Sequence, residues 1–160
     1  MTDLRTRPFR RVREYMHADP PTITLAATFS DVARAMRDRK TNGLIVIDAE
    51  RRPVGVVASQ LLIRHVLPMY LNRAAALSAF DNPYTFRRRV HAVARDPITA
   101  FMSTPVQTVQ AEAPMIEAAA ILAAYRQLPV VDAAGRLVGL LTRTDLKNVI
   151  AEILDEGLPS

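Results

Sequence analysis

The sequence predicts an α/β (α+β) fold made of two pseudo-symmetric β-α-β-β-α repeats that pack through their sheets, with a helical insertion between them. The main observation is an internal repeat, because Leu44-Ile-Val-Ile-Asp48 is matched by Leu128-Pro-Val-Val-Asp132. Gly55 and Gly139 follow these segments, and like the two aspartates they are 84 positions apart. A strand, a turn and a second strand therefore recur in register.

Apolar residues at helical spacing flank both predicted hairpins. The stripes that precede the hairpins are Phe29, Val32, Ala33 and Met36 in the first copy and Met115, Ala118, Ala119 and Leu122 in the second. The stripes that follow them are Leu62, His65, Val66 and Met69, and Leu146, Val149, Ile150 and Ile153. Spacings of three and four residues are typical of one face of an amphipathic helix. Each repeat therefore has a helix before and after its hairpin.

The two copies differ in local detail. Thr28 and Asp31 have the spacing of a capping box, whereas the second copy has Pro114 at the cap position and its helix begins without a side-chain cap. Gly135 tolerates a positive φ in the second turn, and residues 48–51 contain no such residue, so we expect the second hairpin to be tighter. Strands 44–47 and 54–57 are apolar on both faces, which indicates burial between layers.

These patterns divide the chain into five parts. We expect a basic arm at 1–14, a first repeat at 15–67, a helical insertion at 68–97, a second repeat at 98–154 and a tail at 155–160. The insertion has two helical segments, 69–80 and 84–94, separated by Asp81-Asn-Pro83. With 160 residues, of which 49% are hydrophobic, the chain fits one compact domain built from two half-sized units.

Composition limits the class of protein. The absence of cysteine excludes disulfides and thiolate metal sites, and no apolar run approaches the roughly 20 residues of a membrane span. We therefore expect a cytoplasmic protein that does not enter a membrane. The net charge of +5 favours an anionic partner, which leaves a phosphate ligand, a nucleic acid and an acidic protein open. The run Arg87–Arg89 is better explained as a solvated helix face than as a binding patch.

The strongest candidate for a binding site is Thr142-Arg-Thr-Asp145, where a strand ends and a helix begins. The helix N-terminus, the Thr142 hydroxyl and the Asp145 carboxylate suit a ligand with a phosphate and a sugar diol. The same spacing also makes an ordinary capping box, so both interpretations stay open. The first copy has Ala58 and Leu61 at these positions, and this asymmetry favours a single ligand cleft.

No catalytic set and no metal site is expected. The sequence has no cysteine nucleophile, no Gly-x-Ser-x-Gly and no Walker loop. His17, His65 and His91 are far apart, and His65 falls on an apolar helix face where a half-buried packing role is expected. We therefore do not expect an enzyme.

Three segments of the second copy, together with Glu117 in its first helix, carry a resemblance to a known family: 128–132, 135–139 and 142–146. The tandem units resemble a pair of CBS domains (cystathionine-β-synthase type) joined as a Bateman module, over residues 12–67 and 98–154. The resemblance implies a regulatory module that binds an adenine nucleotide (AMP, ADP or ATP) or S-adenosylmethionine between the repeats, with no required cofactor. It also implies a homodimer that acts on an unidentified regulated protein.

The resemblance further implies which residues hold the ligand. Asp145 holds the ribose, Thr142 and Thr144 meet the phosphate, and the adenine side is formed by Pro21, Thr22, Thr41, Asn42 and Gly43, with Gln127. Arg143 and Arg126 are candidate phosphate partners or solvated residues. A second, degenerate cleft has Ala58 and Leu61 facing Val106, Gln107, Tyr125 and Arg126, and it lacks the ribose carboxylate; Tyr125 is either a stacking residue or, by preference, core. Two alternatives are a nucleic-acid-binding protein that uses its Arg-rich segments and a ligand-free dimerisation scaffold.

Overall fold

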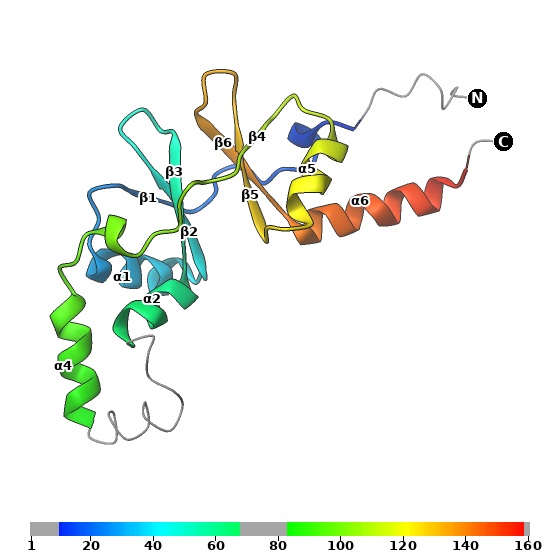
Figure 1. The fold of residues 1–160 in the computed structure, drawn as a ribbon. Coiled ribbons are helices and arrows are strands. Elements are labelled where there is room, and N and C mark those ends of the chain that lie inside the picture. The colour runs from blue at the N-terminus through cyan, green and yellow to red at the C-terminus, as the bar shows by residue number, and fades with distance from the viewer. Residues whose placement is uncertain (1–9, 68–82, 159–160) are drawn as a thin grey trace. The chain divides into compact units, whose positions relative to one another are not determined.

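A computed structural model describes residues 10–67 and 83–158 and contains two three-stranded sheets (Figure 1). The first has the order β1 (Thr22–Thr24), β2 (Gly43–Ile47), β3 (Pro53–Ala58), and the second has the order β4 (Val109–Gln110), β5 (Gln127–Val131), β6 (Leu137–Thr142). β1 is parallel to β2 and β4 is parallel to β5, while β5 and β6 form an antiparallel hairpin. The two sheets thus have the same strand order.

Helices alternate with these strands as the repeat predicts. They are α1 (Phe29–Arg39), α2 (Ser59–Val66), α4 (Pro83–Val93), α5 (Met115–Leu122) and α6 (Arg143–Glu156), with short 3-10 helices at Val12–Glu14 and Ile98–Ala100. The two β-α-β-β-α repeats are therefore confirmed. Within the predicted insertion, α4 matches the expected helix at 84–94 within one residue at each end, and the expected helix at 69–80 lies outside the described residues.

The chain forms two compact units that do not coincide with its two halves. The β1–β3 unit contains the described residues 21–49, 54–67 and 83–106, and the β4–β6 unit contains 10–20, 50–53 and 107–158. The segment that precedes the first strand of each repeat is therefore part of the unit built on the strands of the other repeat. The repeat pattern in the sequence gave no sign of this exchange of segments.

The N-terminal segment, residues 10–17, is an integral part of the β4–β6 unit (dark blue beside α5 in Figure 1). The backbone N–H of Val12 donates to Ala113 O at 3.0 Å, and the side chain of Val12 is fully buried. His17 and Leu140 exchange two backbone hydrogen bonds, each 2.9 Å long. These contacts add a short bridge to the edge of β6, so residues 10–17 pack as part of the domain.

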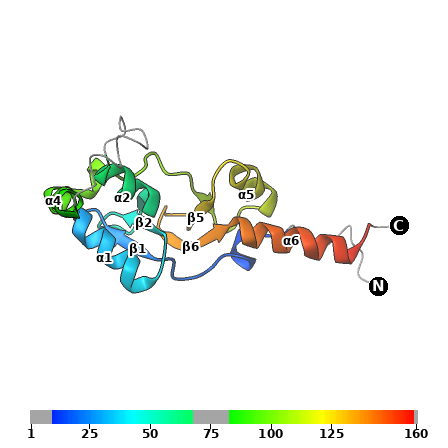
Figure 2. The same cartoon turned by 90° about the horizontal axis from the view of Figure 1, so that it is seen from below.

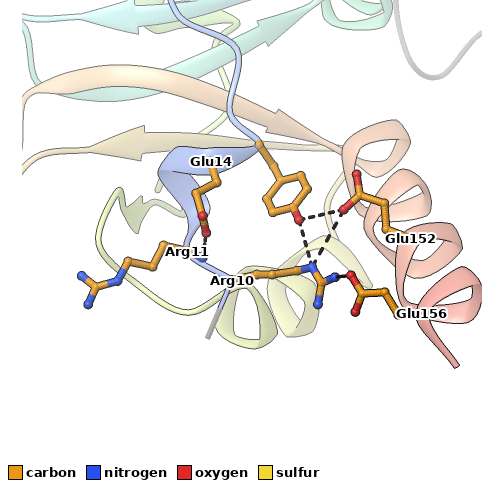
Figure 3. A network of polar contacts seen from close by, with 6 residues as sticks. Arg10, Arg11, Glu14, Glu152 and Glu156 are labelled. Atoms are coloured by element: carbon orange, nitrogen blue, oxygen red, sulfur yellow. Dashed lines mark hydrogen bonds and ion pairs between the residues drawn. The ribbon is translucent and has the colours of Figure 1, made fainter. Parts of the chain in front are cut away.

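A polar network ties the same segment to α6 (Figure 3). The Nε of Arg10 donates to the Tyr15 hydroxyl at 2.9 Å, and this hydroxyl donates to Glu152 Oε2 at 2.9 Å. The Arg10 guanidinium also forms an ion pair with Glu156. Burial raises the pKa of the Tyr15 phenol, and its hydrogen bond to Glu152 raises it further. The network therefore fastens the N-terminal segment to the last two turns of the C-terminal helix.

The segment before β4, residues 98–103, completes the β1–β3 unit as residues 10–17 complete the β4–β6 unit. Ile98 N donates to Ala27 O at 3.0 Å, and Val56 and Ser103 exchange backbone hydrogen bonds of 3.1 and 2.8 Å. Ile98 and Ser103 lie 86 positions after Val12 and His17, and Ile98 is fully buried as Val12 is. The two units are therefore completed by equivalent segments.

The predicted helix stripes before the hairpins are confirmed. Phe29, Val32 and Met36 of α1 are buried, and so are Met115, Ala118 and Leu122 of α5, in separate cores of the two units. The stripe predicted on α6 is partly wrong. Val149 is buried, but Ile150 and Ile153 are 52% and 47% exposed, because α6 continues as one uninterrupted helix away from the end of β6 (Figure 2).

The predicted caps are present. Thr28 Oγ1 accepts from Asp31 N, and Asp31 Oδ2 accepts from Thr28 N at 2.9 Å. The backbone N–H of Thr28 holds the pKa of Asp31 below its usual value, so this stabilisation is present at neutral pH and is lost as the pH falls through the lowered pKa. Pro114 caps α5 without a side-chain hydrogen bond, and Arg10 O accepts the first helical N–H from Met115 at 2.8 Å.

Two predictions about the hairpins are wrong. Val54 and Val56 are half-buried, so β3 alternates in burial where burial on both faces was expected. The expectation of a tighter second hairpin is also wrong, because the connections 48–52 and 132–136 have equal length. The first connection contains a positive φ without a glycine: Arg51 adopts φ 63°, and its carbonyl accepts from Leu137 N at 2.9 Å. In the second hairpin Gly135 has φ 81°, as its glycine suggested, and Asp132 Oδ1 accepts two backbone N–H groups of that turn.

Glycine is required where the segments 10–17 and 98–103 pack against strands β6 and β3. A Cβ at Gly139 would lie 2.6 Å from Met16 Sδ and 3.0 Å from His17 O, and a Cβ at Gly55 would lie 2.9 Å from Met102 Sδ and 3.1 Å from Ser103 O. We predict that Gly139→Ala and Gly55→Ala each lower the free energy of unfolding by about 1–3 kcal/mol through overpacking.

Urea unfolding of the two alanine variants checks this prediction. Adding Met16→Ala to Gly139→Ala should recover part of the loss, because only the His17 carbonyl then stays in the way. A change below about 0.5 kcal/mol in both single variants would show that the segments do not pack this closely.

Candidate functional site

The Thr142–Asp145 motif lies where β6 ends and α6 begins, and it forms a capping box. Thr142 Oγ1 accepts from Asp145 N at 3.4 Å, while Asp145 Oδ2 accepts from Thr142 N at 2.8 Å and from the Thr142 hydroxyl at 3.0 Å. Of the two interpretations that the sequence left open, the structure therefore shows the cap. The Asp145 side chain is fixed at the N-terminus of α6, where the helix dipole favours negative charge.

Asp145 differs from an ordinary capping residue in its burial and in its second oxygen. The residue is only 7% exposed, and it is the one buried charged residue in the described part of the chain. Its Oδ1 lies 2.7 Å from Nε2 of His17, whose own side chain is 62% exposed. A buried carboxylate needs hydrogen-bond donors, and here His17 and Thr142 supply them.

Other predicted residues of the β4–β6 unit have specific positions around this motif. Gln127 is the cross-strand neighbour of Thr142 on β5, so the two lie side by side. Thr144 is exposed on the first turn of α6. The guanidinium of Arg143 donates from Nε to Leu122 O at 3.0 Å and from Nη2 to Ala123 O at 3.4 Å. Arg143 thus binds the last carbonyl groups of α5, and contact with a phosphate would require this arrangement to change.

Apart from Gln127, the residues predicted for the adenine side lie in the β1–β3 unit. They gather around the loop that leads into β2. The carbonyl oxygens of Pro21 and Asn42 accept from Ile45 N and Ser59 N, and the Thr22 carbonyl accepts from the Arg39 side chain. The Thr41 hydroxyl donates to Gly43 O and accepts from Gly43 N. This loop is therefore well ordered by hydrogen bonds. Whether it shares a ligand with Asp145 stays a prediction.

The equivalent position in the first repeat lacks the box. Ala58 is the residue before α2 and makes no side-chain cap, Ser59 is the first helical residue, and Leu61 is half-buried. Of the residues predicted to face them, Val106 is half-buried, and Gln107, Tyr125 and Arg126 are exposed. Tyr125 is 48% exposed, so the preferred interpretation of it as a core residue is wrong.

The β1–β3 unit has its own histidine–carboxylate pair. His65 Nε2 lies 2.7 Å from Asp96 Oδ2, and the His65 ring packs 5.7 Å from Phe29 and 5.1 Å from Phe101. The half-buried packing role predicted for His65 is confirmed, and its contact with Asp96 was missed. Among residues 10–67 and 83–158, no group of three or more His, Cys, Asp or Glu has a geometry that holds a metal ion. None of the described helices is long and apolar enough to cross a membrane.

The arginine run on α4 is divided in its roles. Arg87 and Arg88 are exposed, which agrees with a solvated face. Arg89 is half-buried, and its guanidinium donates from Nε to Val66 O at 2.9 Å and from Nη2 to His65 O at 3.4 Å. It therefore caps the C-terminus of α2, a role that a run of like charges gave no sign of.

The fold and the motif define a tandem-repeat α/β module with a helix-capping carboxylate in one repeat. The model of the CBS domain family matches residues 12–68 and 95–152, more than half of the chain. The chain therefore belongs to the CBS domain family, and it carries a pair of these domains.

Curated relatives and solved structures agree with this assignment. The chain is 27% identical over 156 residues to the chloroplastic CBS domain-containing protein CBSX2 of Arabidopsis thaliana, covering 92% of this chain and 64% of the relative. It is 25% identical over 150 residues to a CBS domain-containing protein of Dictyostelium discoideum, covering 92% and 96%. Two uncharacterized relatives, from Methanopyrus kandleri and Methanocaldococcus jannaschii, are longer, and the chain spans 61% and 32% of their lengths.

Among solved structures, CBSX2 of Arabidopsis thaliana superposes with a TM-score of 0.72 at 22% identity, covering 92% of this chain and 99% of the other. CBSX2 in complex with AMP gives 0.64 at 23% identity, covering 89% and 96%. The CBS domain pair of protein MJ0100 in complex with 5-methylthioadenosine and S-adenosyl-L-methionine gives 0.63 at 19% identity, covering 91% and 98%. At these identities the similarity shows a shared fold.

The two capping boxes allow the structural role of Asp145 to be measured. We predict that Asp145→Ala lowers the free energy of unfolding by more than Asp31→Ala, because it removes the carboxylate half of the capping box and also the contact with His17. Asp31→Ala removes the carboxylate half of an exposed capping box alone.

Urea unfolding of both variants at pH 7 gives the comparison. Equal losses would mean that the contact between His17 and Asp145 contributes nothing to the stability of the unligated protein.

Proposed function

We propose that the chain is a non-catalytic regulatory module that binds an adenine nucleotide or an adenosyl ligand at the Thr142–Asp145 motif. The observation that carries this proposal is Asp145, a buried carboxylate held at the N-terminus of a fourteen-residue helix beside the hydroxyl of Thr142. The AMP and S-adenosyl-L-methionine complexes of proteins with the same fold support the choice of ligand class.

The chemistry of this helix terminus suits such a ligand. The unpaired N–H groups and the positive dipole end of α6 attract a phosphate or another anionic group, and the exposed Thr144 hydroxyl adds a donor on the first turn. A carboxylate accepts hydrogen bonds only, so Asp145 suits the hydroxyl groups of a ribose. Gln127, beside Thr142 on β5, adds an amide that reads either a donor or an acceptor.

We assign no reaction to this site. It offers a carboxylate that is fixed in a helix cap and accepts from the Thr142 hydroxyl, and both groups are used by that cap. A module of this kind acts through binding: a ligand that prefers one arrangement of the two units shifts their equilibrium, and a regulated protein responds to that shift. We place this activity in the cytoplasm.

Titration calorimetry with AMP, ADP, ATP and S-adenosylmethionine tests the proposal. We predict that at least one of these ligands binds and that Asp145→Ala weakens its binding by about 1–3 kcal/mol, because hydrogen bonds to a charged group are lost. Asp145→Asn keeps the volume of the side chain and serves where the alanine variant is too unstable.

Asp31→Ala is the matched control, since it removes the capping carboxylate of α1. Its ligand affinity should equal that of the wild type. The proposal fails if none of the four ligands binds, or if the Asp145 variants bind as tightly as the wild type.

We further propose that two copies of the chain associate through α6. The apolar side chains at the C-terminal end of α6 are not covered within one chain: Ile150, Ile153 and Leu154 are 52%, 47% and 75% exposed. Burying a large aliphatic side chain is worth about 1.5–3 kcal/mol, which favours association of these faces.

Sedimentation equilibrium measures this association. We predict a dimer for the wild type and a monomer for Ile153→Asp, while Leu158→Asp, a change at an exposed apolar residue beyond the end of α6, stays dimeric. A monomeric wild type would refute the homodimer.

A further inference from the structure

The contact between His17 and Asp145 bears on how the proposed ligand enters its site, so this inference rests on the proposed function. A carboxylate has two oxygens with about four acceptor positions in all. Asp145 Oδ2 already accepts two hydrogen bonds from Thr142, and Oδ1 is 2.7 Å from His17 Nε2. One acceptor position therefore stays open. A ribose diol donates two hydrogen bonds, so one existing contact must yield before both hydroxyls bind.

His17 is the contact that yields at the lowest cost. The donors of Thr142 are its own backbone N–H and a hydroxyl in the capping box, and losing them would unravel the start of α6. The imidazole of His17 is 62% exposed, so it leaves Asp145 by rotating into solvent. Its backbone stays in place, because His17 and Leu140 are joined by two hydrogen bonds of 2.9 Å.

The β1–β3 unit shows that the equivalent segment does not need histidine for its structural role. Ser103 is the residue equivalent to His17, and it exchanges the same pair of backbone hydrogen bonds with Val56. The residue equivalent to Asp145 in that unit is Leu61. The imidazole is therefore present in the unit that has the carboxylate and absent from the unit that lacks it, although the same pair of backbone hydrogen bonds is made in both.

We propose that His17 is a gating residue for the Asp145 site. In the unligated protein its imidazole occupies Oδ1, and a ligand with a vicinal diol displaces it. A ligand with one hydroxyl at this place uses the open acceptor position and leaves His17 bound. His17 thus sets the ligand concentration at which diol-bearing ligands fill the site, without reducing the binding of their deoxy analogues.

Calorimetry with AMP and 2′-deoxy-AMP on the full chain tests the gate. We predict that His17→Ala binds AMP about three- to tenfold more tightly than the wild type, since the ligand no longer competes with a charge-assisted hydrogen bond that is weakened by solvent. Its affinity for 2′-deoxy-AMP should change less than twofold. His17→Gln should resemble the wild type, because the Gln amide donates from nearly the position of Nε2.

Imidazole NMR signals of His17 in the wild type give a second readout that a structural role would not move. They should shift on saturation with AMP to the position they take in Asp145→Asn, and they should stay in place with 2′-deoxy-AMP.

The outcomes separate this inference from the proposed function. Absence of AMP binding to the wild type and to both His17 variants would refute the nucleotide function and the gate together. AMP binding that is unchanged in His17→Ala would refute the gate alone. Weaker AMP binding in His17→Ala would make His17 a direct ligand contact. Equal gains in affinity for AMP and 2′-deoxy-AMP would mean that His17 does not compete with the diol. Either result overturns the gate.

Discussion

The pairing of residues 10–17 with the second repeat is the contact on which the rest of the β4–β6 unit depends. Val12 fills the core of this unit, the Arg10 carbonyl accepts the first N–H of α5, and His17 bonds to the edge of β6. These contacts join segments about 100 to 125 residues apart in the chain. Because closing so long a loop costs entropy, the buried apolar side chain and the satisfied backbone groups must together outweigh that cost.

The candidate site depends on this pairing. β6 delivers Thr142 to the start of α6, the capping box fixes Asp145, and the N-terminal segment supplies His17 to its second oxygen. A carboxylate that is 7% exposed is costly unless its hydrogen bonds are made, and in the described part of the chain no buried side-chain nitrogen or oxygen lacks a hydrogen-bond partner. The same property makes Asp145 a good acceptor, because donors that replace His17 meet an oriented carboxylate with little water around it.

Features that rest on local contacts were predictable from the sequence. The stripes of α1 and α5, the Thr28–Asp31 cap and α4 depend on neighbours three or four residues away, so their patterns are legible in a short window. The internal repeat added the order of strands and helices along the chain in both copies. For the site, the sequence identified Thr142 and Asp145 but left their geometry open between a ligand contact and a cap.

Features that rest on distant contacts were not predictable. Nothing near His17 shows that its ring meets a carboxylate 128 positions later, and nothing near Arg143 shows that it holds the C-terminus of α5. Arg51 adopts a positive φ while its carbonyl is bonded to Leu137, so a tertiary contact overrides its local preference. Aligning the two repeats upstream of their motifs, at the offset of 86, would have placed His17 opposite Ser103 and shown that residues 10–17 and 96–103 are equivalent segments.

Native-state hydrogen exchange measured by NMR tests most directly whether residues 10–17 belong to the folded unit. We expect three amides to exchange equally slowly: that of Val12, which donates to Ala113, that of Leu140, which donates to His17, and the core amide of Val130. The reason is that all three become exposed in one cooperative opening event. Rapid exchange at Val12 and Leu140 beside a protected Val130 would mean that the segment frays independently, and the account of the site built on it would be wrong.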